Sequence, residues 1–268
     1  MKRISVVVPT YEEEESIEEF LKQFERQTLP RSDFEIIIVD GDSRDRTREI
    51  AERYADKVII QRRKGIGGAR NDGVDVASAP FVATTDADTI LPERWLEIML
   101  SHFERDEDVV AVVGPDGPIE NSLRARIIYF LLRNIIHLAT FFGLYTTGGT
   151  NSGFRRSAFL RIGGYKSLPH SDDVEIGFRL RKIGRIVYDK DLYVRLSVRR
   201  MEKMGYINTL LTWLKGDLRI ICGLEVRLCK AEILISGQPS SLKDAHNRDF
   251  ISETFSSFLR IEVSLKSP

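Results

Sequence analysis

The chain has 268 residues, of which 42% are hydrophobic, so it can bury a substantial core in one large domain. Its 40 basic and 40 acidic residues cancel to a formal charge of zero. Nucleic-acid-binding proteins usually carry a strong basic excess, so this balance argues against nucleic acid as a partner. The apolar run after Met1-Lys2-Arg3 is too short for the hydrophobic part of a signal peptide, so we expect a cytoplasmic protein.

The N-terminal part alternates short β-branched runs with segments of helical period, which is typical of βα units that form a parallel sheet. Strands are expected at Ile4–Val8, Phe34–Val39, Lys57–Ile60, Phe81–Thr84 and Val109–Val113. Helices are expected at Glu13–Gln27, Asp45–Tyr54, Gly68–Ala77 and Pro92–Phe103. The second strand is apolar on both faces, as in strands covered by helices on each side. The pattern predicts an α/β fold with a doubly wound, mostly parallel sheet.

Polar clusters follow three of these strands. They are Pro9-Thr10-Tyr11-Glu12, Asp40-Gly41-Asp42-Ser43 and Asp86-Ala87-Asp88. In doubly wound sheets, ligands bind beyond the carboxyl ends of the strands, near the point where the strand order reverses. The second cluster has an alternative interpretation, because Asp42 or Ser43 could cap the following helix and Asp45 suits its first turn.

Five segments taken together resemble the family 2 glycosyltransferases of the GT-A fold. They are Val8–Glu13, Ile38–Thr47, Gly68–Gly73, Asp86–Asp88 and Asp172–Leu180, in an order and at spacings that carry the resemblance over roughly residues 3 to 200. The resemblance implies an inverting enzyme that uses a nucleotide sugar. It predicts a GT-A domain at residues 1–200, with a nucleotide-sugar-binding half at 1–115 and an acceptor half at 116–200.

From the resemblance, a set of residues is expected to hold the nucleotide. Its members are Pro9, Thr10, Tyr11, Glu12 and Asp40 around the base and ribose, and Arg70 near the base and diphosphate. A carboxylate can accept a base N–H, and a guanidinium can pair with phosphate oxygens. Two positions depart from the family pattern, because Glu12 stands where Asn is frequent and Gly41 where a second Asp is frequent.

Asp86 and Asp88 lie two residues apart, so in an extended segment their side chains point to the same face. Carboxylate oxygens suit Mg²⁺ or Mn²⁺, which usually binds through one or two carboxylates and substrate phosphates. In the family, the last aspartate of this motif contacts the metal and the first faces the nucleotide sugar. We therefore expect Asp88 as the metal ligand and Asp86 as a substrate contact, with a simple polar turn as the alternative.

A second pair of carboxylates stands at Asp172 and Asp173. Asp172 with Glu175 fits a capping box, which leaves Asp173 unexplained. The resemblance assigns to Asp173 the role of general base, which takes the proton from the acceptor hydroxyl, and expects Asp172 beside it as a substrate contact. Glu175 and Arg179 are four residues apart and could pair on one helix.

Many family members supply a downstream histidine to the metal or diphosphate, but this chain has none between His170 and His246. Two interpretations of Arg199 and Arg200 stay open: they cover the diphosphate, or they lie at a solvated strand end. The Gln-x-x-Arg-Trp signature of processive polysaccharide synthases is absent, although Trp213 is nearby. The sequence therefore favours the transfer of a single sugar.

Two apolar segments follow in the second half of the chain. Ile127–Tyr145 approaches the length of a membrane span but is interrupted by Arg133, Asn134 and His137. Ile207–Ile221 repeats apolar residues at helical spacing within a basic region. Each segment either packs on the catalytic layer or lies on an anionic membrane surface, at the inner face of the cell membrane.

After the GT-A domain we expect an amphipathic helical extension at residues 201–236 and a weakly ordered tail at 237–268. The predicted function is a metal-dependent, inverting transfer of one sugar from a UDP or GDP type of donor to a hydroxyl of a glycan or a lipid-linked acceptor. Two alternatives stay open. A GT-A-like module could bind nucleotide sugars without turnover, or the chain could be a sugar nucleotidyltransferase, which usually has a Gly-rich loop where this chain has Pro9-Thr10-Tyr11.

Overall fold

The computed structural model describes residues 1–120, 122–141, 148–168 and 171–197, together with Gly205, Thr212, Lys215, Gly216 and Ile220. Contacts divide the chain into two units, Met1–Leu224 and Glu225–Pro268, and the described residues all belong to the first. Apart from those five single residues, the predicted extension and tail lie outside the described residues. Arg199 and Arg200 lie outside them as well.

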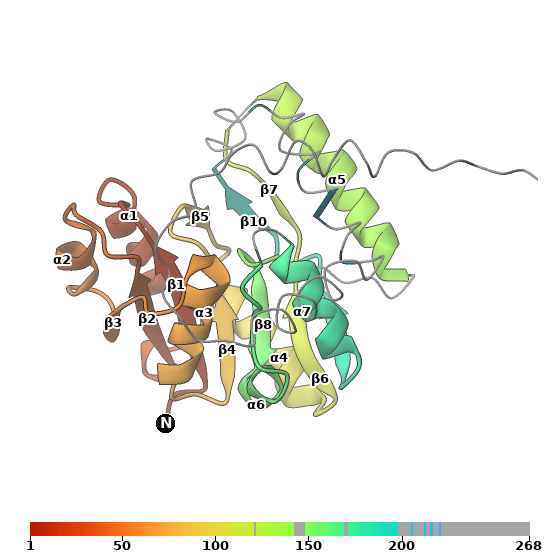
Figure 1. The fold of residues 1–268 in the computed structure, drawn as a ribbon, viewed down its shortest axis with the longest axis horizontal. Helices are drawn as coiled ribbons and strands as arrows, with labels where there is room; N and C mark the ends of the chain where they lie inside the picture. Colours follow the sequence, from red (N-terminus) through yellow and green to blue (C-terminus); the bar gives the residue numbers. More distant parts are fainter. Residues whose placement is uncertain are drawn as a thin grey trace, which may run out of the picture. The chain divides into compact units, whose positions relative to one another are not determined.

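The main sheet has seven strands in the order β3-β2-β1-β4-β8-β6-β9 (Figure 1). They are β1 (Ile4–Thr10), β2 (Phe34–Asp40), β3 (Lys57–Ile60), β4 (Phe81–Thr84), β6 (Val109–Val113), β8 (Ser152–Arg155) and β9 (Arg185–Tyr188). Strand β8 runs antiparallel to β4 and β6, whereas the other neighbours pair in parallel. The predicted doubly wound, mostly parallel sheet is confirmed. Its order reverses at β1, which lies between β2 and β4.

A smaller sheet has three strands, β5 (Thr89–Ile90), β10 (Val194–Leu196) and β7 (Asp116–Pro118). The central strand β10 pairs antiparallel with β5 and parallel with β7. Strand β5 begins directly after Asp88, so this sheet ties the Asp86–Asp88 loop to the start of the second half of the chain.

Helices cover both faces of the main sheet, and α5 packs against the small sheet. They are α1 (Ile17–Lys22), α2 (Thr47–Ala51), α3 (Gly65–Val76), α4 (Trp95–Arg105), α5 (Leu123–Phe141), α6 (Arg156–Arg161) and α7 (Asp172–Arg181), with short 3-10 helices η1 (Gln23–Arg26) and η2 (Arg31–Asp33). Strand β1 shows why two layers form, because its successive side chains point to opposite faces. Val6 belongs to one buried cluster and Val7 to the other.

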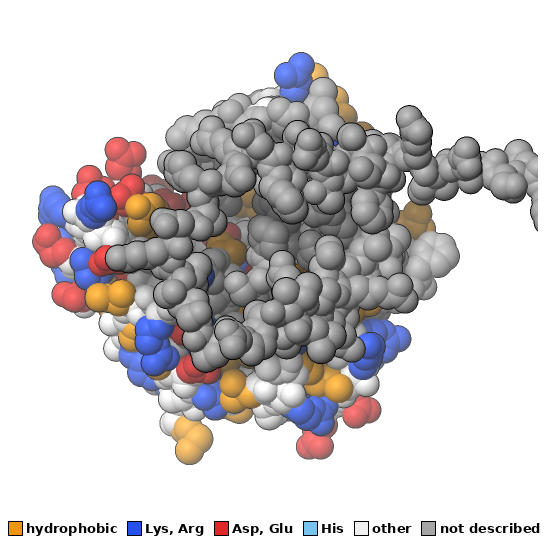
Figure 2. All heavy atoms as spheres, in the orientation of Figure 1, with side chains coloured by type: hydrophobic (Ala, Val, Ile, Leu, Met, Phe, Trp, Pro, Cys, Tyr) orange, Lys and Arg blue, Asp and Glu red, His pale blue; other side chains and the backbone are white. Residues whose placement is uncertain are grey.

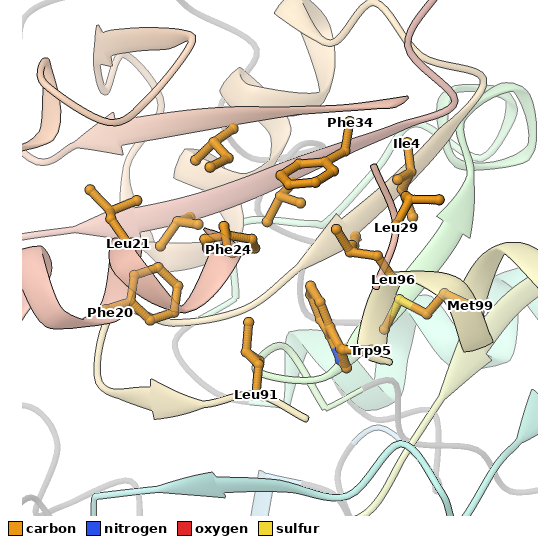
Figure 3. Close-up of a cluster of buried hydrophobic side chains, with 14 of the residues drawn as sticks. Ile4, Phe20, Leu21, Phe24, Leu29, Phe34, Leu91, Trp95, Leu96 and Met99 are labelled. Carbon is orange, nitrogen blue, oxygen red and sulfur yellow. The ribbon is translucent and has the colours of Figure 1, made fainter. Parts of the chain in front are cut away.

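The first cluster packs α1, η1 and α4 under the sheet, with Phe20, Phe24 and Trp95 among its largest side chains (Figure 3). The second cluster packs α3, α6 and α7 on the opposite face, through side chains such as Phe159 and Ile176. Trp95 is fully buried, and its Nε1 donates to Asn151 Oδ1 at 2.9 Å. This bond ties α4 to the segment that leads into β8.

Two predicted helices are longer than the observed ones. The first begins only at Ile17, because Glu12 has a left-handed backbone (φ 53°) and Glu13 closes a turn in which its carbonyl accepts from Ser16 and Ile17. The second begins only at Thr47, whose N–H and hydroxyl both donate to Asp45 Oδ1, at 3.0 and 2.6 Å. A backbone turn at Glu13 and a side-chain bond at Asp45 therefore stand in place of the predicted first helical turns.

The proposed caps of the second helix are wrong. Its N-cap is Arg46, and no side chain bonds to the helix from that position. Asp42 has a left-handed backbone (φ 66°), and the Ser43 hydroxyl donates to Asp40 instead. Asp42 and Ser43 therefore do not cap the helix, and Ser43 instead organises the end of β2.

Charged side chains of both signs mix on the visible surface, most clearly around α1 and α2 at the left of Figure 2. Several form exposed pairs, such as Arg46 with Glu49 at 3.3 Å. Helix α5 packs against β7 through Ala125 and Tyr129, which form a small cluster with Leu196 of β10. Among the described residues, no helix combines the length and apolar character needed to cross a membrane.

Candidate active site

The ends of β1 and β2 are joined through Asp40, which is 0% exposed. Its Oδ1 accepts from Ser43 N at 2.8 Å, and its Oδ2 accepts from Ser43 Oγ at 2.7 Å and Thr10 Oγ1 at 3.2 Å. The Ser43 hydroxyl in turn accepts from Glu12 N at 2.9 Å. The Asp40 carboxylate therefore holds the two strand ends together and is directed into the protein.

The predicted segment Pro9–Glu12 lies at the carboxyl edge of the sheet, beside the point where the strand order reverses. Pro9 is opposite Val39 in the register of β1 and β2. The following Tyr11 is 58% exposed, and its ring lies next to Gly41, so it presents an aromatic surface at this edge. The structure thus brings the first two polar clusters of the sequence side by side.

The third cluster pairs with Arg70 of α3. This arginine is only 3% exposed, and its Nη2 donates to Asp86 Oδ1 at 2.8 Å. The guanidinium carbon lies 5.7 Å from the centroid of the Tyr165 ring. Among the described residues, Arg70 Nε has no hydrogen-bond partner, which leaves one buried donor of this side chain to be satisfied.

Gly149 was not predicted as part of the site. A Cβ atom on this residue would lie 2.1 Å from Arg70 Nη1, so only glycine leaves room for the guanidinium. Its carbonyl accepts from Thr84 Oγ1 at 3.0 Å, which fixes the turn against the end of β4. The only signal in the sequence is the Gly148-Gly149 pair before β8.

Asp88 is partly buried and lies directly before β5. No group of three or more His, Cys, Asp or Glu side chains that could hold a metal ion occurs in the described part of the chain. Mg²⁺ and Mn²⁺ do not need such a group where substrate phosphates complete the coordination. The carboxylates of this loop therefore fit an ion that is shared with a diphosphate, and they do not form a closed protein cage.

The start of α7 differs from the predicted capping box. Asp172 is the first helical residue, and the N-cap is Ser171, whose backbone is left-handed (φ 61°). The side chain of Glu175 turns to Lys166 Nζ at 2.6 Å and to Arg179, whose Nε donates to its two oxygens at 2.9 and 2.8 Å. The capping box is wrong, whereas the predicted pairing of Glu175 with Arg179 is confirmed.

Asp172 reaches the first turn of α3, since a Cβ atom on Gly67 would lie 2.5 Å from Asp172 Oδ2. Burial raises the pKa of Asp172, repulsion from Asp173 raises it further, and the Arg70 guanidinium opposes both. Asp172, Asp173 and Asp86 therefore share one electrostatic environment around Arg70. The sequence predicted these carboxylates as site residues in two separate motifs, and the fold brings the two motifs together around Arg70.

Asp116 of β7 is a second residue that the sequence reasoning missed. It is partly buried, and burial together with the nearby Asp173 carboxylate raises its pKa to about 6, against attraction from Arg133 of α5. A signal was available, because Asp116 follows a buried strand as the other clusters do. The site thus has a further carboxylate on the side of the Asp172-Asp173 pair.

Comparison with known proteins places this arrangement in a family. A family model described as "Glycosyl transferase family 2" matches residues 5–163. The chain is 34% identical over 100 residues to "Glycosyltransferase AglE" of Haloferax volcanii, covering 35% of this chain and 33% of that protein. It is 26% identical over 206 residues to "Probable glycosyltransferase YdaM" of Bacillus subtilis, covering 69% of this chain and 48% of that protein.

Two solved structures share the fold. The mannosyltransferase PcManGT from Pyrobaculum calidifontis, in complex with GDP-Man and Mn²⁺, aligns with a TM-score of 0.61 and 26% identity over 76% of this chain and 58% of that chain. Residues 1–349 of Staphylococcus aureus TarS, in complex with UDP-GlcNAc, align with a TM-score of 0.59 and 22% identity over 74% of this chain and 59% of that chain.

The match spans less than half the length of the two curated relatives named above. The family model nevertheless covers more than half of this chain, including β1, β2, the Asp86–Asp88 loop and β8. The seven-stranded sheet agrees with both solved structures, which confirms the predicted GT-A fold. The chain belongs to glycosyl transferase family 2.

Proposed function

We propose that the chain transfers one sugar from a nucleoside diphosphate donor to an acceptor hydroxyl, with inversion at the anomeric carbon. The observation that carries this proposal is the buried Arg70–Asp86 ion pair at the end of β4. The same Arg70 guanidinium also interacts electrostatically with Asp172 at the start of α7. The two solved relatives, whose structures contain GDP-Man and UDP-GlcNAc, support a nucleotide sugar as the donor.

The nucleotide would lie over the ends of β1 and β2. Pro9, Thr10, Tyr11 and Glu12 would surround the base and ribose, and the exposed Tyr11 ring offers an apolar face to the base. Asp40 would contribute indirectly, because its hydrogen bonds with Thr10 and Ser43 hold these residues in place at the strand ends. Arg70 would direct its guanidinium to the diphosphate, where a buried cation interacts strongly with phosphate oxygens.

Asp88 would hold a Mg²⁺ or Mn²⁺ ion together with the diphosphate, while Asp86 would face the nucleotide sugar. When bound, this ion would neutralise the charge that develops on the leaving diphosphate. The Mn²⁺ of the Pyrobaculum calidifontis complex supports a divalent metal. Arg199 and Arg200, which lie outside the described residues, are proposed to add positive charge over the diphosphate.

Asp173 would act as the general base. Its carboxylate takes the proton of the acceptor hydroxyl, and the hydroxyl oxygen forms a bond to the anomeric carbon. The bond from that carbon to the diphosphate breaks on the opposite face, and its electron pair leaves with the nucleoside diphosphate. The neighbouring Asp172 would accept a hydrogen bond from the acceptor or the donor sugar.

The acceptor is proposed to be a glycan or a lipid-linked sugar at the inner face of the cell membrane. Helix α5, which packs against β7, exposes a row of large apolar side chains. They are Leu123, Ile127, Phe130, Leu131, Ile135 and Leu138, and the exposed Arg124 and Arg126 lie on the same helix. An apolar face flanked by cationic side chains suits the surface of an anionic bilayer.

The full chain should be incubated with UDP- and GDP-sugars and Mn²⁺, and release of the nucleoside diphosphate measured with glycan and lipid-linked acceptors. Acceptor-dependent release that stops in excess chelator supports the proposal. Nucleotide binding without release under any of these conditions would favour a binding module instead. Formation of a nucleotide sugar from a nucleoside triphosphate and a sugar phosphate would identify a nucleotidyltransferase.

A further inference from the structure

Gln61, directly after β3, has a fixed side-chain orientation. Its Nε2 donates to the carbonyl oxygens of Arg63 and Gly65, the latter at 2.8 Å. Because a carbonyl can only accept, these two bonds decide which end of the carboxamide is the nitrogen. The oxygen Oε1 therefore points away from the Arg63–Gly65 loop.

This oxygen faces the end of β2. A Cβ atom on Gly41 would lie 3.4 Å from Gln61 Oε1 and 3.2 Å from Tyr11 Cδ2. The amide oxygen and the aromatic ring therefore lie on either side of the space that a side chain at Gly41 would occupy. Backbone bonds hold this edge in place, since Gly41 N donates to Thr10 O at 2.8 Å and Gln61 N to Asp40 O at 2.7 Å. The hydrogen-bond acceptor Gln61 Oε1 thus lies beside the exposed ring of Tyr11, where backbone bonds connect the ends of β1, β2 and β3.

The neighbouring carboxylate of Asp40 is engaged within the protein in this structure. It is 0% exposed and already accepts three hydrogen bonds, from Thr10 and Ser43. A ligand at this edge therefore meets the amide oxygen of Gln61 before it meets the carboxylate of Asp40.

Resting on the proposed function, the geometry points to Gln61 as the residue that reads the base of the donor. Its Oε1 accepts a hydrogen bond from a ring N–H while the base packs against Tyr11. Uracil and thymine carry such an N–H at N3 and guanine at N1, whereas cytosine and adenine have an accepting nitrogen at the corresponding position. The donor class is a nucleoside diphosphate sugar with a ring N–H on its base.

The test compares bases of equal ring size. Affinities of the full chain for UDP and CDP, and for GDP and ADP, are measured by calorimetry with Mn²⁺. The wild type should prefer UDP to CDP or GDP to ADP, and Gln61→Met should reduce that preference by about tenfold, as expected for the loss of one hydrogen bond. The affinity for inorganic pyrophosphate should stay unchanged.

Two further variants separate base reading from support of the loop. Gln61→Glu keeps an accepting oxygen but loses the two donors to Arg63 and Gly65, so it should keep the preference while binding all nucleotides more weakly. Gln27→Met is the matched control, because this carboxamide also uses both ends, with Pro92 O at 2.9 Å and Leu96 N at 3.2 Å. It should behave as the wild type.

Three outcomes would overturn the inference: an unchanged preference in Gln61→Met, an equal loss for all nucleotides and pyrophosphate, or a lost preference in Gln61→Glu. Each leaves the proposed function standing, because the wild type still binds nucleoside diphosphates. A wild type that binds none of the four would contradict the proposed function itself, and this inference with it.

Discussion

The guanidinium of Arg70 donates to Asp86 at 2.8 Å across a site in which the arginine is almost completely buried. This ion pair connects α3 to the loop after β4. Removing either partner of a buried ion pair is costly, because the other charge then stays buried without compensation. We therefore propose that Arg70 has both a structural and a binding role, and two measurements can separate these roles.

Replacement of Arg70 by Met should reduce the free energy of unfolding by about 3 kcal/mol, since it breaks a buried pair. It should also abolish the binding of nucleoside diphosphates. Urea unfolding and calorimetry give the two values. Arg46→Met, which removes an exposed pair with Glu49, is the control and should cost less than about 1 kcal/mol. Full nucleotide affinity in Arg70→Met would refute the assignment of the diphosphate site.

Asp88→Ala should remove the contribution of Mn²⁺ to nucleotide binding while the protein remains folded. In the proposed site the Asp88 carboxylate supplies oxygen ligands to an ion that the diphosphate also coordinates, so the variant should bind UDP or GDP equally well with and without metal. A thermal-shift series with and without chelator measures this. Asp42→Ala removes an exposed carboxylate from the neighbouring strand end and should retain the metal effect. A normal metal effect in Asp88→Ala would show that other ligands hold the ion.

Asp173→Asn keeps the size of the side chain and removes the proposed proton acceptor. Donor affinity should persist, while the rate of transfer should fall by about 10²-fold or more, the usual contribution of a general base. Initial rates at saturating donor, together with calorimetry, provide the two values. Asp172→Asn is the comparison, and the larger loss of transfer should belong to Asp173. The opposite order would assign the base to Asp172.

Periodicity in the sequence was sufficient to predict the five N-terminal strands, because β-branched apolar runs in a parallel sheet have few other stable arrangements. It was insufficient for the starts of α1 and α2, where Glu13 and Asp45 accept hydrogen bonds from residues that were predicted to lie within the first helical turns. Such bonds depend on the local backbone path, which composition does not reveal.

The site shows the same division. The predicted end of β4 was sufficient to place Asp86 and Asp88 at the edge of the sheet. The contact between Arg70 and Gly149 could not be predicted, because it joins residues far apart in the chain. The burial of Asp40 follows from the hydroxyls of Thr10 and Ser43, which only the folded strand ends bring together. Asp116 was missed because its proximity to Asp173 depends on the packing of β7, α7 and α5.

Asp116 gives a prediction for the pH dependence of stability. Its pKa is about 6 in the native state, against an ordinary value of 3.8, because burial and Asp173 disfavour its charge and Arg133 only partly compensates. The native state therefore binds more protons than the unfolded state between these values. The contribution to stability is complete below pH 3.8 and is lost as the pH rises through about 6, by at most about 3 kcal/mol.

The substitution Asp116→Asn should remove this pH-dependent loss of stability. Relative to the wild type, its free energy of unfolding should increase between pH 4 and pH 7, as measured by urea unfolding in the presence of chelator. Titrating groups that do not interact with Asp116 are shared by both proteins and cancel in the difference. A difference that does not change with pH would show that the Asp116 carboxylate titrates as an exposed one.

The last prediction concerns α5, whose exposed apolar side chains recur at helical spacing. Leu131 is 55% exposed and Ile135 63% exposed, one turn apart on one face. If this face lies on the bilayer, the protein should sediment with vesicles that contain anionic phospholipid at low salt, and less at high salt, because Arg124 and Arg126 contribute through screened charges.

The double variant Leu131→Ser with Ile135→Ser should weaken vesicle binding by more than about tenfold, since each buried apolar side chain contributes about 1.5–3 kcal/mol. Nucleotide affinity should stay unchanged, because neither residue lies at the strand-end edge. Leu160→Ser is the control, since Leu160 is 42% exposed on α6 and should not affect sedimentation. A wild-type protein that stays in the supernatant with every lipid composition would contradict membrane docking through α5. The acceptor should then be sought among soluble glycans, with the α5 face left as a contact for another protein surface.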